Sequence, residues 1–313
     1  MNTAPERLKV VLAGGSGSLG RRIAADLGDH DVVVLTRRVN PALGVRQVPW
    51  DGRTVGDWAA ELDGPNTAVI NLAGKLVDCR PTQRNIAQLR DSRVLATRAL
   101  VEASRQLKAP TAHWIQASTT AIWSDAGETR CDETTPLPTG LTQMTGVAEP
   151  WEHAYRASPG ANTRHGVILR TAVVLDPDSP ALTRLVGLTK YGLGGRVGTG
   201  RQWFSWIHLY DWLAIVRACL GLTPGVTIPS GVLVAAADHP VRNRDLMATL
   251  RWQLHRPAAP PTPAVLVKLG AVVLRTDPAL GLTGRHATSK VLKDTGFEFR
   301  FPTLDAALAD LLS

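Results

Sequence analysis

Short apolar segments, several of them rich in valine and isoleucine, recur along the first half of the chain and predict β-strands. Between two of these segments, residues 92–107 carry apolar side chains at helical spacing, among them Val94, Leu100 and Val101. Strands separated by helices predict a parallel sheet with right-handed crossovers. The five predicted strands cover residues 8–13, 31–36, 68–72, 113–118 and 166–175.

The pattern becomes less regular after residue 175. A glycine-rich loop covers residues 192–203, and a proline-rich stretch covers residues 256–263. Residues 297–302 alternate apolar and polar side chains, which predicts a strand. The other elements predicted in this half are helices over residues 182–193, from about 211 to 222, 241–255 and 304–312, and a strand within residues 226–236.

The first apolar run ends in a glycine-rich turn, and a helix-like pattern follows at once. Gly14, Gly17 and Gly20 stand three residues apart. This arrangement lets the backbone turn tightly, approach a pyrophosphate closely and pack the helix against the strand that it follows. The free N–H groups and the positive dipole end of that helix favour phosphate. The turn expected to meet a dinucleotide consists of Gly14, Ser16, Gly17, Ser18, Leu19 and Gly20.

The end of the second predicted strand indicates which dinucleotide is bound. An acidic residue at this position favours NAD, whereas arginine favours the 2′-phosphate of NADP. The chain has Thr36, Arg37 and Arg38 here and no acid. We therefore expect NADP(H), with Arg37 as a bidentate phosphate partner. The alternative is that both arginines are solvated surface charges.

These features predict an α/β fold, in which a Rossmann doubly wound parallel sheet carries a smaller C-terminal α/β cap. We expect residues 1–175 to form the NADP-binding domain. Residues 176–313 are expected to cap the carboxyl edge of the sheet, where ligands bind in this architecture, and to return a strand and a helix to the sheet.

Composition limits the other function classes. The chain has 313 residues, 44% of them hydrophobic, and a net charge of +8 that is spread along the sequence, so we expect no nucleic-acid partner. It contains no run of roughly 18 apolar residues, and we expect no membrane partner and a cytoplasmic location. The three scattered cysteines fit a reducing compartment, and no cluster has metal-ligand spacing. A homodimer is compatible with the sequence.

Several segments together resemble the atypical extended short-chain dehydrogenases/reductases. Within that superfamily, the chain is similar to the epimerase-family subgroup that carries a short C-terminal domain of undefined role. The similarity extends over nearly the whole chain. The segments that carry it are residues 14–20, 36–37, 70–74, 92–93, 151–152, 169–171, 200–208 and 296–299, together with Pro302.

The resemblance implies further cofactor contacts. Small residues at the end of the third predicted strand would form the floor beneath the pyrophosphate, and a following helix would approach the cofactor. Arg93 on that helix has the alternative of a purely structural role. The positions implied in this way are Leu72, Ala73, Gly74, Gln88 and Arg93, with Thr171 and Val173 near the nicotinamide.

The resemblance also implies a catalytic Ser or Thr, a Tyr, and a Lys four residues after the Tyr. Thr119 matches the hydroxyl position best, with Ser118 beside it, although both hydroxyls have the alternative of bonding the backbone at a strand end. The Tyr and Lys positions hold Met144 and Ala148, which do not titrate. Other candidate proton donors, none of them favoured, are Lys75, Glu152, His153 and His208, and Arg201 is a candidate for holding an anionic group of the substrate.

We therefore expect an NADP-dependent oxidoreductase or epimerase-like enzyme that acts on a small molecule. Hydride transfer to a C=C, C=N or C=O group is the predicted reaction, and the missing Tyr–Lys pair favours an alkene or imine over a simple ketone. The alternative is a non-catalytic NADP(H)-binding sensor or regulatory module. Sugar-nucleotide epimerisation is a weaker third possibility because that chemistry depends on the missing tyrosine.

Overall fold

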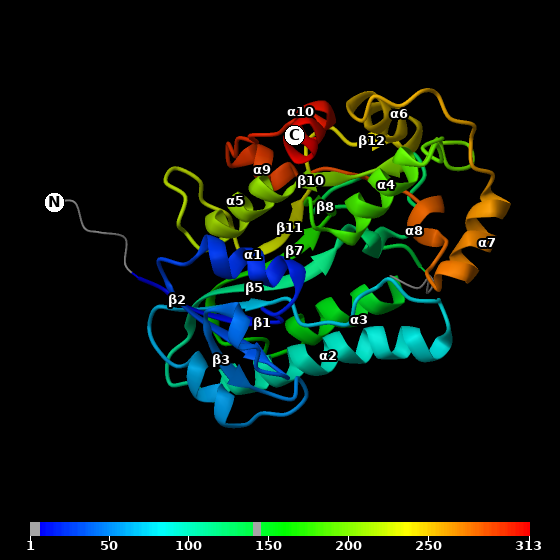
Figure 1. Ribbon diagram of the computed structural model, residues 1–313. Helices are drawn as coiled ribbons and strands as arrows, with labels where there is room; N and C mark the ends of the chain where they lie inside the picture. The colour runs from blue at the N-terminus through cyan, green and yellow to red at the C-terminus, as the bar shows by residue number, and fades with distance from the viewer. Residues whose placement is uncertain (1–6, 140–144) are drawn as a thin grey trace.

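The computed structural model describes residues 7–139 and 145–313, and its centre is a seven-stranded parallel sheet (Figure 1). The strand order is β11-β7-β5-β4-β1-β2-β3. The chain adds β2 and β3 on one side of β1 and then adds β4 and the later strands on its other side, so the order of the strands reverses between β1 and β4. A reversal of this kind creates the crevice in which doubly wound folds bind ligands. The strands are β1 (Lys9–Ala13), β2 (Asp31–Thr36), β3 (Arg46–Pro49), β4 (Thr67–Asn71), β5 (Thr111–Thr119), β7 (Thr163–Thr171) and β11 (Gly231–Ala235).

Helices cover both faces of the sheet, which explains why its central strands are apolar on both sides. Val10 and Leu12 of β1 contribute to one core, together with α1 (Ser18–Asp26) and α5 (Leu209–Cys219). Val11 and Ala13 of the same strand contribute to the opposite core, against α2 (Gln83–Arg105). Helix α3 (Thr145–Arg156) packs beside α2 on this second face.

A third core lies in the C-terminal half. Helix α4 (Pro180–Lys190), helix α6 (Asn243–Gln253) and the last helix, α10 (Leu304–Leu312), pack together above the carboxyl edge of the sheet (Figure 1). Two short parallel strands, β8 (Val173–Leu175) and β10 (Trp206–His208), connect this cap to the sheet. The chain therefore forms a Rossmann-like sheet with a smaller α/β cap.

The remaining described elements are short, apart from α7. They are η1 (Pro41–Leu43), η2 (Asp57–Leu62), η3 (Thr120–Trp123), β6 (Arg130–Cys131), β9 (Trp203–Phe204), β12 (Val241–Arg242), α7 (Ala264–Leu274), α8 (Ala279–Leu282), β13 (His286–Ala287) and α9 (Lys290–Asp294). Among the helices of residues 7–139 and 145–313, none combines the length and the apolar character needed to cross a bilayer.

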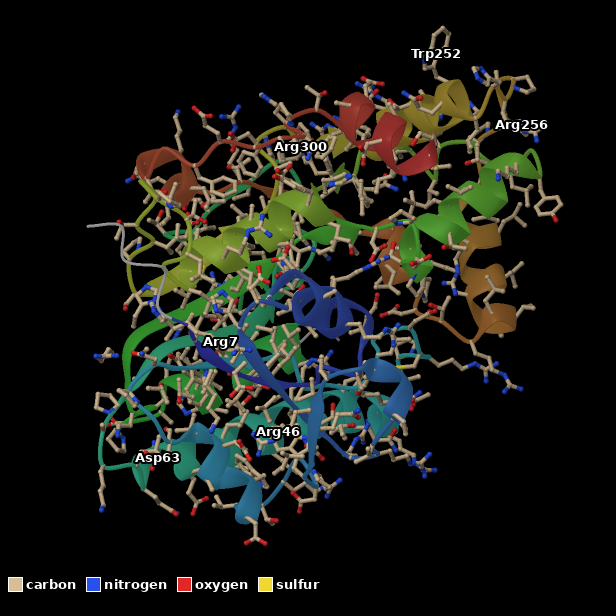
Figure 2. All side chains as sticks on the ribbon, turned by 60° about the vertical axis from the view of Figure 1, so that its left-hand side comes forward. Arg7, Arg46, Asp63, Trp252, Arg256 and Arg300 are labelled. Carbon is tan, nitrogen blue, oxygen red and sulfur yellow. The ribbon has the colours of Figure 1, made fainter. Side chains whose placement is uncertain are left out.

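Residues 297–302 are irregular, so the strand predicted there is wrong. Phe297 and Phe299 do pack against the core, which accounts for the apolar alternation. The N–H groups of Arg300 and Phe301 donate to the carboxylate of Asp211, at 2.8 and 3.0 Å, instead of to a neighbouring strand. A side-chain acceptor thus satisfies this backbone, and Arg300 lies on the outside of the cap (Figure 2).

The predicted strands of the first half are confirmed, and Ala172 separates β7 from β8 in the last of them. Helix α2 begins nine residues before the predicted start at 92, because Thr82 accepts from the N–H of Asn85 and caps a polar first turn. Strand β3 and helix α7 were not predicted. The described segment 256–263 has no helix or strand, as predicted from its prolines.

Candidate functional site

The glycine-rich turn lies between β1 and α1, against the end of β4. Gly14 has φ +83°, and a Cβ built on it would lie 2.8 Å from the carbonyl carbon of Leu72. A side chain there would therefore both strain the backbone and overlap the neighbouring strand end. The N–H of Gly17 donates to the carbonyl of Gly14 at 3.0 Å, which closes the turn.

Gly20 allows α1 to pack directly on this turn. A Cβ on Gly20 would lie 2.5 Å from the Cα of Gly15 and 2.6 Å from the carbonyl oxygen of Gly14. Gly17 caps α1, so the helix begins at Ser18 and its first N–H groups have no partner within the helix. Ser18 is exposed at this end, whereas Leu19 packs against the core. The result is a helix end with open N–H groups, of the kind that favours anions, beside the crevice of the sheet.

A cavity of about 630 Å³ opens beside this turn, between the carboxyl ends of β1, β2 and β4. Its size suits a large ligand. The residues that line it are Gly14, Ser16, Gly17, Leu35, Thr36, Arg37, Trp50, Asp51, Gly52, Arg53, Leu72, Ala73, Gly74, Lys75, Leu76, Gln88, Asp91, Ser92 and Ala96. The structure thus brings most of the expected cofactor positions together. The expected positions outside this lining are Ser18, Leu19, Gly20, Arg93, Thr171 and Val173.

Cationic groups lie at the end of β2 and opposite it. Arg37 is exposed at the rim of the cavity, and Arg53 lines it from the turn after β3. The hydroxyl of Thr36 donates to the carbonyl of Arg38 at 2.8 Å, so Thr36 shapes the turn that carries Arg37. From the third side, Lys75 donates to Oε1 of Gln88 at 2.5 Å. The cavity rim therefore combines three cations with the open end of α1.

Two carboxylates accompany these cations in the lining, Asp51 and Asp91. Asp51 accepts from the hydroxyl and N–H of Thr54 and from the N–H of Arg53. These hydrogen bonds lower the pKa of Asp51 to about 2, so it is a fixed anion at neutral pH. The sequence analysis missed this wall, residues 50–53, because it follows the unpredicted strand β3. The Trp50-Asp51-Gly52 turn after four extended residues was the available signal.

Arg93 lies behind the cavity and not in its lining. It is buried, it donates to the carbonyls of Leu89 and Lys75 at 3.0 Å, and its guanidinium lies over the ring of Trp151. Burial lowers the pKa of Arg93 to about 10, which still leaves it charged at neutral pH. A Cβ on Gly74 would lie 2.9 Å from this guanidinium, so Gly74 leaves room for it. In this position Arg93 supports the loop after β4.

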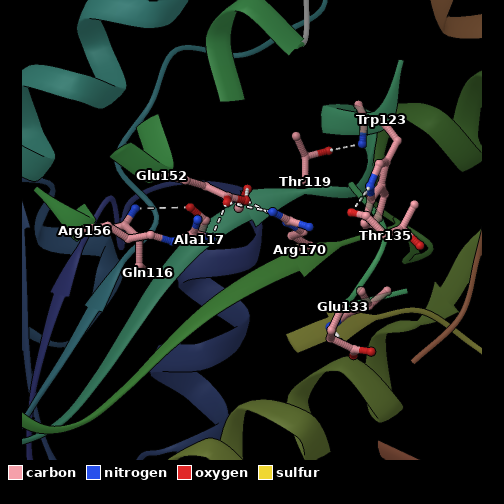
Figure 3. A network of polar contacts seen from close by, with 12 residues as sticks. Gln116, Ala117, Thr119, Trp123, Glu133, Thr135, Glu152, Arg156 and Arg170 are labelled. Atoms are coloured by element: carbon pink, nitrogen blue, oxygen red, sulfur yellow. Dashed lines mark hydrogen bonds and ion pairs between the residues drawn. The ribbon is translucent and has the colours of Figure 1, made fainter. Parts of the chain in front are cut away.

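The carboxyl ends of β5 and β7 carry a buried ion pair (Figure 3). Ser118 and Arg170 are neighbours in the register of the two strands. Arg170 donates two hydrogen bonds, of 2.8 and 2.9 Å, to Glu152 of α3, and the Ser118 hydroxyl donates to the same carboxylate at 2.6 Å. Arg156 adds a more exposed donor at 2.7 Å, and Arg170 lies over the ring of Trp123. Ser118 is thus held inside a structural network.

Thr119 and Thr171 are register partners one position further along β5 and β7. Thr119 accepts from the N–H of Ala121 at 3.1 Å and caps η3, and within the described part of the chain no acceptor takes its own proton. Thr171 accepts from the indole of Trp212 at 3.2 Å. Val173 follows in β8, beside β10. Thr119 and Thr171 are both partly exposed, and neither belongs to the lining of the cavity.

The family's catalytic Tyr and Lys positions correspond to Met144 and Ala148 in this chain. Ala148 is buried in α3, and Met144 lies outside the described residues. None of the chain's three tyrosines lines the cavity. Tyr155 is directed at Gly166, and burial raises its pKa to about 12. At neutral pH its proton stays on the phenol.

The other candidate proton donors are separated in space. Lys75 lines the cavity, and His153 is exposed on α3. His208 caps α5 by accepting from the N–H of Tyr210 at 3.0 Å and stacks on Phe301, which is a structural role. Arg201 is exposed, and its carbonyl accepts a hydrogen bond of 2.5 Å from Arg242.

Sequence patterns of known families match two parts of the chain. Residues 10–222 match the "NAD dependent epimerase/dehydratase family", and residues 262–311 match DUF1731, a domain of unknown function. The epimerase family protein ML0860 of Mycobacterium leprae is 30% identical over 312 residues, which cover 99% of this chain and 97% of that protein.

Solved structures are similar as well. The crystal structure of the human epimerase family protein SDR39U1 (isoform 2) with NADPH has a TM-score of 0.82 and 27% identity, covering 96% of this chain and 98% of that one. A nucleoside-diphosphate sugar epimerase from Corynebacterium glutamicum has a TM-score of 0.74 and 27% identity, covering 98% of this chain and 58% of that one.

Proposed function

The chain belongs to the NAD dependent epimerase/dehydratase family, and on this basis we propose that it binds NADP(H) and transfers hydride to or from a small molecule. The observation that carries the proposal is the combination of two features in one cavity. These are a glycine turn without room for side chains and a cationic rim at the end of β2. The similar human protein was crystallised with NADPH.

The described residues fit this cofactor. Gly14 leaves space that a Cβ would fill, and the open N–H groups at the start of α1 suit a pyrophosphate. Arg37, with Arg53 across the cavity, suits the 2′-phosphate of the adenosine. Leu72, Ala73 and the turn glycines form the floor. When bound, the cofactor supplies a hydride donor or acceptor, and the protein supplies orientation and electrostatics.

Proton supply distinguishes this site from that of an ordinary short-chain dehydrogenase. The Ser118 hydroxyl already donates to Glu152, and Arg170 donates to the same carboxylate. The hydroxyl proton of Ser118 is therefore not free for a substrate. Thr119 can donate a hydrogen bond but is too weak an acid to protonate an alkoxide outright. The residues at the ends of β5 and β7 therefore orient a substrate and polarise it, without a strong acid.

The substrate class follows from this limit. A ketone develops full alkoxide charge during reduction and needs a good proton donor, whereas an iminium arrives already protonated. An activated alkene leaves its negative charge delocalised, so a hydrogen bond from Thr119 and a proton from water suffice. We therefore favour a C=C or C=N group as the site of hydride transfer.

Two measurements test this function. NADPH should raise the melting temperature and quench tryptophan fluorescence, with weaker effects from NADH. Oxidation of NADPH is then followed with panels of enones, cyclic imines and ketones, and turnover is expected with the first two classes. If neither nucleotide binds, the proposal fails as a whole; if NADPH binds and ketones are the preferred substrates, the proposed substrate class fails.

A second candidate, a non-catalytic NADP(H)-binding sensor, is favoured by one observation. The buried network of Ser118, Glu152 and Arg170 stabilises the expected catalytic end internally, and no tyrosine lines the cavity. This candidate predicts tight NADPH binding, a conformational response to the oxidation state of the cofactor, and no turnover with any panel. Turnover with any panel separates the two: a sensor shows none, whereas in an enzyme Thr119→Val should lower turnover and leave NADPH binding unchanged.

A further inference from the structure

Helix α7 turns its most apolar side toward solvent. Val265, Leu266, Leu269, Val272 and Val273 are between 56 and 80% exposed. Their spacing, i, i+1, i+4, i+7 and i+8, places all five on one stripe of the helix. Ala271, on the opposite side, is the one residue of α7 that is fully buried. An ordinary surface helix buries its apolar side and exposes its polar side.

The position of α7 explains how such a helix is held. It lies at the outer edge of the cap, beside α4 and α8 (orange, Figure 1). Arg80, in the loop after β4, donates to the carbonyl of Val272 at 2.8 Å. Thr276, just after the helix, donates to Asp78 of the same loop. The inner side is therefore fixed to the body of the protein, while the apolar stripe stays uncovered by any described residue.

The two chain segments beside this stripe carry basic residues and no acid, and Asp78, from the loop after β4, pairs with Arg184 at 2.8 Å at the end of α7. Residues 179–210 and 246–276 contain no aspartate or glutamate. The two segments are neighbours, because the N–H of Gly198 donates to the carbonyl of Thr262 at 2.8 Å, and Arg251 donates to the carbonyl of Gly194 at 2.5 Å. Their basic residues are Arg184, Lys190, Arg196, Arg201, Arg251, Arg256, Lys268 and Arg275.

Aromatic side chains stand at the margin of the same two segments. Tyr191, directly after α4, is 87% exposed, and Trp252, near the end of α6, is 78% exposed. Trp252 and Arg256 project from the cap into solvent (Figure 2). Exposed Trp and Tyr beside apolar and basic residues are typical of surfaces that enter the headgroup region of a bilayer.

We propose that the α7 surface, defined as α7 with Arg275 and residues 190–201 and 251–263, docks on the surface of an anionic phospholipid bilayer. The apolar stripe would enter the interface, and the surrounding lysines and arginines would meet the lipid phosphates. A helix of 11 residues is about 16 Å long, roughly half of the hydrocarbon thickness, so it lies on the membrane and does not cross it. This departs from the expectation of no membrane partner, which rested on the absence of a spanning segment.

Charge decides between this occupant and a second copy of the chain. A symmetric dimer through α7 would bring the basic residues of both copies together with no acidic residue from these segments to balance them. Like charges facing each other oppose association, whereas an anionic bilayer complements them.

The test is sedimentation of the full chain with vesicles. Vesicles of phosphatidylcholine alone are compared with vesicles of phosphatidylcholine and phosphatidylglycerol, at low and high salt. We expect binding to the anionic vesicles, weakened by salt, and little binding to the neutral ones. Val273→Glu should lower the affinity for anionic vesicles at least about tenfold, because it removes buried apolar area and adds an anion.

Val39→Glu is the matched control, because Val39 is an exposed valine outside the α7 surface. It should bind anionic vesicles like the unmodified chain. Lys268→Gln with Arg275→Gln should reduce the salt dependence, and unchanged melting temperatures verify folding. The proposal is overturned if the unmodified chain ignores anionic vesicles or if both valine variants bind equally. It is also overturned if light scattering shows a dimer that Val273→Glu dissociates, since a second copy is then the occupant.

Discussion

The turn between β1 and α1 and the ends of β5 and β7 lie along the same edge of the sheet, yet they are built from different parts of the chain. The turn is a backbone structure: Gly14 and Gly20 work because they have no side chain. The ends of β5 and β7 are a side-chain structure, in which Ser118, Glu152 and Arg170 satisfy one another. The turn leaves backbone N–H groups free to bind a ligand, whereas the network of Ser118, Glu152 and Arg170 satisfies its polar groups internally.

This difference separates binding from chemistry in the molecule. Open N–H groups at a helix end bind an anion without any titratable group. A hydroxyl that already donates to a buried carboxylate has no proton ready for a substrate. The comparison therefore predicts that damage to either region has a distinct signature: changes in the turn abolish cofactor binding, and changes in the network affect stability first.

The largest effect should come from Glu152→Gln, which breaks the buried network. Arg170 would remain buried and charged with its partner neutralised, and such losses cost about 3–5 kcal/mol. The measurement is urea unfolding. Arg156→Gln removes the exposed donor to the same carboxylate and should cost less than about 1 kcal/mol. Similar losses in the two variants would show that the network does not stabilise the fold as argued.

Gly14→Ala tests the other side of the comparison and should cost about 2–3 kcal/mol, from an unfavourable φ and an overlap with Leu72. NADPH should no longer shift the melting temperature. Gly44 is the control, because it also has positive φ but nothing lies within 4 Å of its added Cβ. Gly44→Ala should cost about 1 kcal/mol and leave NADPH binding intact. If Gly14→Ala still binds NADPH normally, the turn is not the phosphate site.

The same contrast explains which parts of the structure were predictable. A tight turn at Gly14 and close helix packing at Gly20 depend on residues a few positions apart, so the sequence pattern contains both. The buried strands followed from their apolar runs for the same reason. The pairing of Ser118 with Glu152 joins residues 34 positions apart, and no local pattern indicates it. Strand β3 was missed because it has only four residues at the edge of the sheet.

Arg93 and helix α7 depend on tertiary neighbours that no local sequence pattern contains. The family resemblance implied that Arg93 approaches the cofactor, with a structural role as the alternative; Gly74 leaves room for its guanidinium, which lies over the ring of Trp151. Helix α7 has the composition of a buried element, yet its apolar stripe is exposed. Arg93 has tertiary neighbours that accommodate its guanidinium, Gly74 and Trp151. The apolar stripe of α7 has no described element that covers it.

Arg37→Gln tests a side chain at the rim of the cavity, next to the glycine turn that offers backbone N–H groups. Loss of a charged hydrogen-bonding partner should weaken NADPH about tenfold to hundredfold and leave NADH almost unchanged. The neighbouring Arg38 is also exposed but does not line the cavity, so Arg38→Gln should have little effect on either nucleotide. Fluorescence titration with both nucleotides measures this. Equal weakening of NADPH and NADH by Arg37→Gln would remove the assigned role in reading the 2′-phosphate.

The smallest effect concerns the opposite ends of the same two strands, where β5 and β7 pair His113 with His165. Their Nδ1 atoms lie 3.3 Å apart, and Nε2 of His165 lies 2.8 Å from the carbonyl of Ile228. This carbonyl can only accept, so Nε2 of His165 donates to it. Burial, then His165 and Arg164, lowers the pKa of His113 below its usual value.

The unfolded chain therefore takes up this proton at a higher pH than the folded chain does. The stability due to neutral His113 is complete above about pH 6.5 and is lost as the pH falls from there toward the folded pKa, by at most about 1.4 kcal/mol per pH unit. His113→Gln should flatten the stability profile in this window, measured by urea unfolding at several pH values. His153→Gln, at an exposed position on α3, should leave the profile unchanged. A profile for His113→Gln parallel to that of the unmodified chain would mean that other groups cause its acid sensitivity.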